Sequence, residues 1–152
     1  MDFYKYRRTL PHWRAAGATY FVTYRIHPSR PPLSPEERDI VLDGWHHYAD
    51  QHYVLGPHVV MDDHVHVLVT PLPRHRLTDI IHSRKSFSAN QFLHTCGRSG
   101  PMWQDEMFDH IIRDEGDYAE KAQYILNNPR KRWPELEEYR WVAEGYGAER
   151  PQ

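Results

Sequence analysis

The sequence has very little cysteine: Cys96 is the only one among 152 residues. A single thiol cannot form an internal disulfide, and it is too few for a zinc site built from several cysteines. The chain also lacks any apolar run of about 18 residues, so we expect no transmembrane helix. Segment 1–13 carries charges without an apolar stretch after them, and we expect no secretory signal there. These absences predict a cytoplasmic protein.

Two common catalytic signatures are also missing. There is no HExxH motif of the kind that binds zinc in metalloproteases, and no GxxxxGK loop of the kind that binds nucleotide phosphates. The net charge is -2 with histidines neutral, which gives no global indication of nucleic-acid binding. Evidence for a function must therefore come from local patterns.

Basic residues gather in two parts of the chain. Between residues 74 and 98 the only acidic side chain is Asp79, and the basic ones are Arg74, Arg76, Arg84, Lys85 and Arg98. Segment 1–17, which we expect to be an irregular arm, adds Lys5, Arg7, Arg8 and Arg14. A local basic surface and an ordinary solvated helix face both agree with this pattern.

Strands are predicted where aromatic and β-branched residues cluster between turn residues. The first covers 19–26, the second 53–62 with a break or bulge at Gly56-Pro57, and the third 64–72. A fourth is expected within 102–114.

Helices are predicted between the strands from capping residues and spacing. Ser34 to Glu37 forms a capping box that starts a helix running to about 51. The second helix covers 76–96 and stops at Gly97, and the third covers 114–129 with Pro129 at its end. The order β-α-β-β-α-β-α favours one α+β domain over 1–152, a ferredoxin-like or RRM-like two-layer sandwich with a central antiparallel sheet. Segment 130–152 would be a tail packed on this body.

His64 and His66 stand two positions apart on the third predicted strand, so their side chains share one face. The valines at 65, 67 and 69 form the opposite face, which we expect to be the core. Two neutral imidazoles at this spacing can converge on one metal ion. Two polar residues on a half-exposed strand are the alternative. A metal site would need a further ligand from elsewhere.

The last predicted helix offers a candidate partner for these histidines. Its apolar line runs through Tyr118, Ala122 and Ile125, whereas Tyr124 has polar neighbours, with Asn128 one turn beyond it. A tyrosine hydroxyl is a poor nucleophile at neutral pH because its ordinary pKa is about 10. It becomes useful when a metal polarises the group it attacks, and the amide oxygen of Asn128 could be the third ligand. The alternative is an exposed tyrosine lying on the helix surface.

Several stretches of the chain occur together in a characteristic order. They are RRTLPHW with GATYFVTYRI, LSPEER, HVHVLVTP, LTDIIHSRKSFSANQF, GPMWQDEMFDHIIRDEGDY and AQYILNNP, spanning about residues 6–145. Together they resemble the HUH endonucleases and, within them, the REP-associated tyrosine transposases of bacteria. The resemblance implies a divalent-metal-dependent nickase and strand transferase acting on single-stranded DNA. His64, His66 and Asn128 would hold Mg²⁺ or Mn²⁺, and Tyr124 would form a 5′-phosphotyrosine.

The resemblance also implies a DNA substrate and a set of contacts. The substrate would be a hairpin from repetitive extragenic palindromes (REP), bound by a monomer that is nucleoid-associated while on DNA. The expected phosphate contacts are Arg7, Arg8, Arg76, Arg84 and Lys85. Lys85 is favoured among them because the family's central helix carries a lysine at that point.

Two stretches depart from the family pattern. Asp62-Asp63 replaces the usual Pro-Asn before the first histidine, where two carboxylates could raise cation affinity or repel the DNA backbone. NPRKRWPELE replaces NPVKAGL after the tyrosine, so the end of that helix differs too. Two other functions remain open: a non-catalytic module that binds DNA or RNA hairpins, and a small metallohydrolase using both histidines and a carboxylate such as Asp62.

Overall fold

The computed structural model describes residues 17–147. Its centre is a five-stranded antiparallel sheet in the order β4-β1-β3-β2-β5. The strands are β1 (Tyr20–Arg25), β2 (Tyr53–Val60), β3 (His64–Pro71), β4 (Phe108–Ile111) and β5 (Val142–Ala143). The helices are α2 (Pro35–His47), α3 (Leu77–Cys96) and α4 (Glu115–Arg132). The predicted α+β class and element order are confirmed, and β5 is an addition from the tail.

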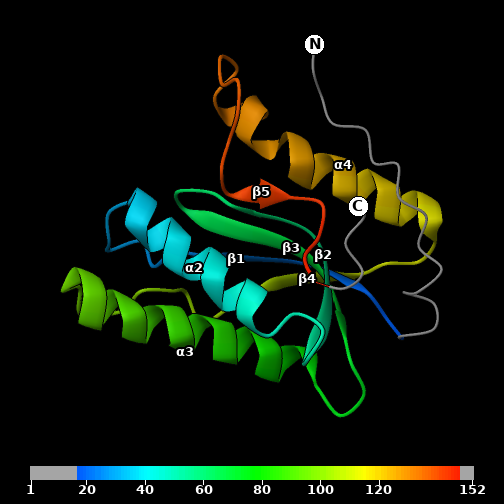
Figure 1. Ribbon diagram of the computed structural model, residues 1–152, viewed down its shortest axis with the longest axis horizontal. Coiled ribbons are helices and arrows are strands. Elements are labelled where there is room, and N and C mark those ends of the chain that lie inside the picture. The colour runs from blue at the N-terminus through cyan, green and yellow to red at the C-terminus, as the bar shows by residue number, and fades with distance from the viewer. Residues whose placement is uncertain (1–16, 148–152) are drawn as a thin grey trace.

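Helices cover both faces of the sheet (Figure 1), with α2 and α3 on one side and α4 on the other. The valines of β3 pack under α2 and α3, as the alternation predicts. The opposite face is a core as well, because Phe21 and Leu68 pack there against Tyr118, Ala122 and Ile125 of α4. The histidine face of β3 is therefore buried, and the alternative of two polar residues on a half-exposed strand does not hold.

Local signals in the sequence set several element boundaries. Ser34 caps α2 with a complete capping box in which Glu37 is the acidic partner. Gly97 ends α3 in the left-handed conformation that glycine favours, at φ 70°. The predicted bulge at Gly56-Pro57 appears as a register shift between Leu55 and His58. None of the helices formed by residues 17–147 has the length and apolar character of a membrane span.

The end of α4 differs from the prediction. Pro129 was expected to stop the helix because proline lacks the N–H that continues it, yet α4 extends to Arg132. The proline is buried, and its carbonyl accepts a bond of 2.8 Å from the Trp133 N–H, so packing stabilises the extra turn. This extra turn carries Arg132 to the turn that precedes β3.

Candidate functional site

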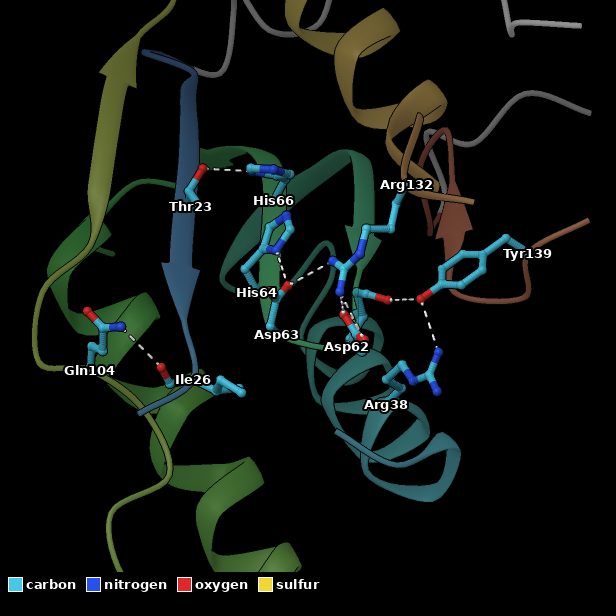
Figure 2. Close-up of polar contacts among 11 residues, drawn as sticks. Thr23, Ile26, Arg38, Asp62, Asp63, His64, His66, Gln104, Arg132 and Tyr139 are labelled. Atoms are coloured by element: carbon cyan, nitrogen blue, oxygen red, sulfur yellow. Dashed lines mark hydrogen bonds and ion pairs between the residues drawn. The ribbon is translucent and has the colours of Figure 1, made fainter. Parts of the chain in front are cut away.

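His66 is the more deeply held of the two histidines on β3. Its side chain faces Thr23, whose Oγ1 lies 2.7 Å from Nδ1 of the ring (Figure 2). Burial, reinforced by nearby His64 and Arg25, lowers the pKa of His66 to about 3. The ring is therefore neutral near pH 7, which is the form that binds metals, and Nε2 is its remaining donor atom.

His64 is fixed in a similar way by a different partner. Its Nδ1 lies 2.6 Å from Oδ1 of Asp63, and its ring centroid is 4.5 Å from that of His66. A carboxylate that holds Nδ1–H orients the ring and increases the basicity of Nε2. Partial burial acts to raise the pKa of Asp63, but the bond with His64 and the charge of Arg132 outweigh it, and this pKa lies below its ordinary value.

Tyr124 of α4 lies beside the histidines. Its ring centroid is 5.3 Å from that of His66 and 6.1 Å from that of Phe21, both in edge contacts. Tyr124 is nonetheless 43% exposed, so a large substrate can reach part of it. Tyr124, the predicted nucleophile, and His66, a predicted metal ligand, are thus neighbours across the α4–β3 interface.

Asn128 lies on the same stripe of α4, one turn after Tyr124 and one turn before Arg132. Tyr124 contacts His66, and Arg132 contacts the turn just before His64, so Asn128 faces the first residues of β3 between them. Its Oδ1 is buried and has no hydrogen-bond partner among the residues that the structure describes. A buried amide oxygen without a partner is costly, and a bound cation would satisfy it.

The donor set suits a metal ion that keeps open positions. Two imidazole nitrogens and one amide oxygen form a mixed set, and water or phosphate oxygens would complete the coordination of Mg²⁺ or Mn²⁺. Within 17–147, no three His, Cys, Asp or Glu side chains are grouped in a way that could hold a metal. A metal at this site would therefore depend on the amide of Asn128.

A cavity of about 730 Å³ opens beside Tyr124 and His66. Its lining includes Arg25, an exposed residue whose Cα is paired with that of His64 across the β1–β3 ladder. Sequence analysis missed Arg25, although the alternation Phe21, Thr23, Arg25 could have assigned it to this face. Phe108 of β4 lies at the same cavity and is 59% exposed, which makes it a candidate surface for a nucleobase.

The residues predicted to contact phosphates differ in how exposed they are to solvent. Arg84 is only 3% exposed: its guanidinium donates to the Gly44 carbonyl and stacks 4.3 Å from the Tyr48 ring centroid. We therefore correct the prediction for Arg84, which joins α2 to α3 and cannot reach DNA. Arg76 is exposed at the start of α3. Arg7 and Arg8 lie outside the described residues.

The ammonium group of Lys85 is hydrogen-bonded to backbone carbonyls of the protein itself. It donates to the carbonyl of Gln104 at 2.7 Å and to those of Asp105 and Glu106 at 3.3 Å. Partial burial lowers its pKa, against the opposing charge of Asp105. Gln104 in turn donates to the Ile26 carbonyl at 3.2 Å (Figure 2). This geometry favours a role for Lys85 in holding the loop that walls the cavity, and the phosphate contact stays a prediction.

Asp62 and Asp63 are paired rather than free. Nη2 of Arg132 lies 3.1 and 3.3 Å from the two carboxylate oxygens of Asp62, and its Nη1 lies 3.5 Å from Oδ1 of Asp63 (Figure 2). The two stretches that depart from the family pattern are therefore in contact with each other. Because Asp62 has this partner, it is poorly placed to serve as the carboxylate of a metallohydrolase.

Comparisons with known proteins show which family and which fold this chain resembles. Residues 46–128 match the family of IS200-like transposases. A REP-associated tyrosine transposase of Escherichia coli (strain K12) is 29% identical over 138 residues, covering 85% of this chain and 81% of the relative. Among solved structures, a REP-associated tyrosine transposase bound to a REP hairpin has a TM-score of 0.64 at 24% identity, covering 91% of this chain and 81% of the other. The last likeness shows a shared fold.

Proposed function

Because this chain belongs to the family of IS200-like transposases, we propose that it cleaves and rejoins single-stranded DNA at REP-like hairpins through a 5′-phosphotyrosine. The observation that carries the proposal is the contact between Tyr124 and His66. One turn away lies the amide oxygen of Asn128, which has no hydrogen-bond partner within residues 17–147. A nucleophile, two imidazoles and an amide oxygen at one interface are suited to attack on a phosphodiester.

We propose that Nε2 of His64, Nε2 of His66 and Oδ1 of Asn128 hold Mg²⁺ or Mn²⁺. Bound there, the cation would withdraw charge from the scissile phosphate and so favour attack. The protein's own contribution is preorganisation: Thr23 and Asp63 fix the two rings through Nδ1 before the metal binds.

The proposed reaction exchanges one phosphodiester for another. Oη of Tyr124 attacks phosphorus, an O–P bond forms, and the bond from phosphorus to the 3′ oxygen breaks. The phenol proton is lost to solvent, and the leaving 3′ oxygen gains a proton. Attack by a later 3′-OH on the phosphotyrosine reverses these steps, so joining needs no nucleotide cofactor.

The cavity beside Tyr124 supplies a path for the strand. Arg25 would contact a phosphate close to the metal, Phe108 would stack on an unpaired base, and Arg76 would contact the backbone farther out. We also propose that the protein acts as a monomer. In support of this, the Tyr124 ring packs against the His66 ring of the same chain, so the site needs no second copy.

The direct test is a covalent adduct. We would incubate the protein with single-stranded hairpin DNA and Mg²⁺ or Mn²⁺, and separate the products on a denaturing gel. A band of protein linked to DNA is expected, and Tyr124→Phe or EDTA should remove it. Tyr146→Phe, which alters another exposed tyrosine, should leave it unchanged.

Two other results would redirect the assignment. Tight hairpin binding without any adduct would favour the binding-only module. Cleavage that survives Tyr124→Phe would favour a hydrolase, for which the described residues offer no group of three acidic, histidine or cysteine ligands.

A further inference from the structure

The turn before β3 concentrates negative charge at the metal-binding end of the site. Asp62 and Asp63 are consecutive, and the second is bonded to His64. A phosphate drawn to this end meets two carboxylates within one or two residues of the first candidate ligand. Like charges at such distances oppose each other strongly when they are partly withdrawn from water.

The last turn of α4 supplies the opposite charge. Arg132 reaches both carboxylates, with its closest approaches at 3.1 Å to Asp62 and 3.5 Å to Asp63. The pairing is partly shielded from solvent, since the Asp62 side chain is 19% exposed and that of Arg132 is 42% exposed. Arg132 leaves this cluster with one net negative charge in place of two.

We propose that Arg132 is a built-in counter-ion that lets a phosphate approach a metal site flanked by two carboxylates, an inference that rests on the proposed function. Arg132 acts through Asp62 and Asp63 and not by touching DNA, so it is a positioning residue. Because α4 continues for another turn beyond Pro129, the guanidinium of Arg132 lies close enough to bond to Asp62 and Asp63. The chain thereby keeps an acidic turn beside a DNA-cleaving site without repelling its substrate.

The test uses a charge-matched pair of variants. Arg132→Met raises the net negative charge of the cluster from one to two, and Arg132→Met with Asp62→Asn returns it to one. Asp63, the partner of His64, is untouched in both. The control is Arg140→Met, which breaks a similar pair between Arg140 and Asp39 of α2. Thermal unfolding would establish that each variant is folded.

Two affinities would be measured at fixed salt: Mn²⁺ for the metal-free protein, by calorimetry, and a single-stranded hairpin without metal. Arg132→Met should weaken hairpin binding roughly tenfold, as expected for about one added negative charge at the phosphate site. It should leave Mn²⁺ binding as tight or tighter. The double variant should regain hairpin affinity, and Arg140→Met should match the wild type.

Other outcomes would overturn the inference. If both affinities fell in Arg132→Met and the double variant restored neither, Arg132 would merely hold α4 in place. Unchanged hairpin binding in Arg132→Met would remove the counter-ion role while the proposed function stood. If the wild-type protein itself bound neither Mn²⁺ nor the hairpin, the proposed function would fail first, and the inference with it.

Discussion

Thr23 and His66 are direct partners across the β1–β3 ladder, and their side chains are joined by a contact of 2.7 Å between Oγ1 and Nδ1. The orientation of one candidate metal ligand is thus set by a neighbouring strand and not by its own. Because both residues are almost fully buried, solvent cannot replace the lost partner if the hydroxyl is removed.

Thr23→Val should therefore weaken metal binding. Loss of a partner that orients a ligating histidine typically costs about 10- to 100-fold in metal affinity, and we expect a loss in that range for Mn²⁺ measured by calorimetry. Thr70→Val is the matched control, because Thr70 is also a buried threonine. Its hydroxyl is bonded at 2.5 Å to that of Thr19 and not to a histidine. Equal metal affinity in the two variants would contradict the assignment of Thr23.

Arg25→Met should weaken hairpin binding without changing its sequence preference. Removal of one phosphate contact lowers the slope of log affinity against log salt by about 1. The measurement is a salt titration of hairpin affinity. Arg84→Met should leave that slope unchanged and should lower the free energy of unfolding, since Arg84 is buried between α2 and α3.

Phe108→Ala should reduce the affinity for DNA with an unpaired base next to the cleavage point. Stacking of a base on an aromatic ring is worth about 1–3 kcal/mol, whereas stability should change little because Phe108 is 59% exposed. Phe108→Trp should retain binding. A 2-aminopurine substituted at successive positions would report stacking by fluorescence quenching, and the loss of quenching should be confined to one position.

Stability should fall as the solution is acidified, and His58 should cause part of the fall. Burial, reinforced by His46 and opposed by the Gly56 carbonyl, lowers the pKa of His58 to about 4. Unfolded histidine has a pKa of about 6.5, so between these values the unfolded state binds a proton that the folded state does not. The contribution of His58 to the free energy of unfolding is fully present above about pH 6.5 and decreases by about 3 kcal/mol on acidification to about pH 4.

Urea unfolding at several pH values would measure this dependence. His58→Gln should reduce the slope of the free energy of unfolding against pH in that range, although His66 adds a contribution of the same sign. An unchanged slope in the variant would show that His58 is protonated in the folded protein.

Much of the fold follows from local patterns, because alternation, capping residues and glycine act within a few residues of chain. The same alternation assigns His64 and His66 to one face, and helical spacing assigns Tyr124 and Asn128 to one stripe. The α4–β3 contact itself follows from no local pattern. It depends on the second apolar face of the sheet, which is formed by residues far apart in the sequence, such as Phe21 and Ile125.

The failures have a common cause. Arg84 carries the charge expected of a DNA contact, but charge does not indicate whether a side chain is bonded to a buried backbone carbonyl. Pro129 carries the expected stop signal, but burial and the Arg132 pairing extend the helix past it. In each case a tertiary contact overrides a local preference.

The backbones of β3 and α4 are held in different ways. Strand β3 is the middle strand, bonded to β1 and β2 on its two edges and covered on both faces, so its amide protons should exchange only when the whole domain unfolds. Tyr124 instead belongs to α4, which packs on one face of the sheet and, within residues 17–147, takes no part in its ladders. Elements held by side-chain packing open locally more often than a central strand paired on both edges, so amide exchange should be faster in α4 than in β3. The two candidate metal histidines would thus lie on the most protected element of the domain, and the candidate nucleophile on a less protected one.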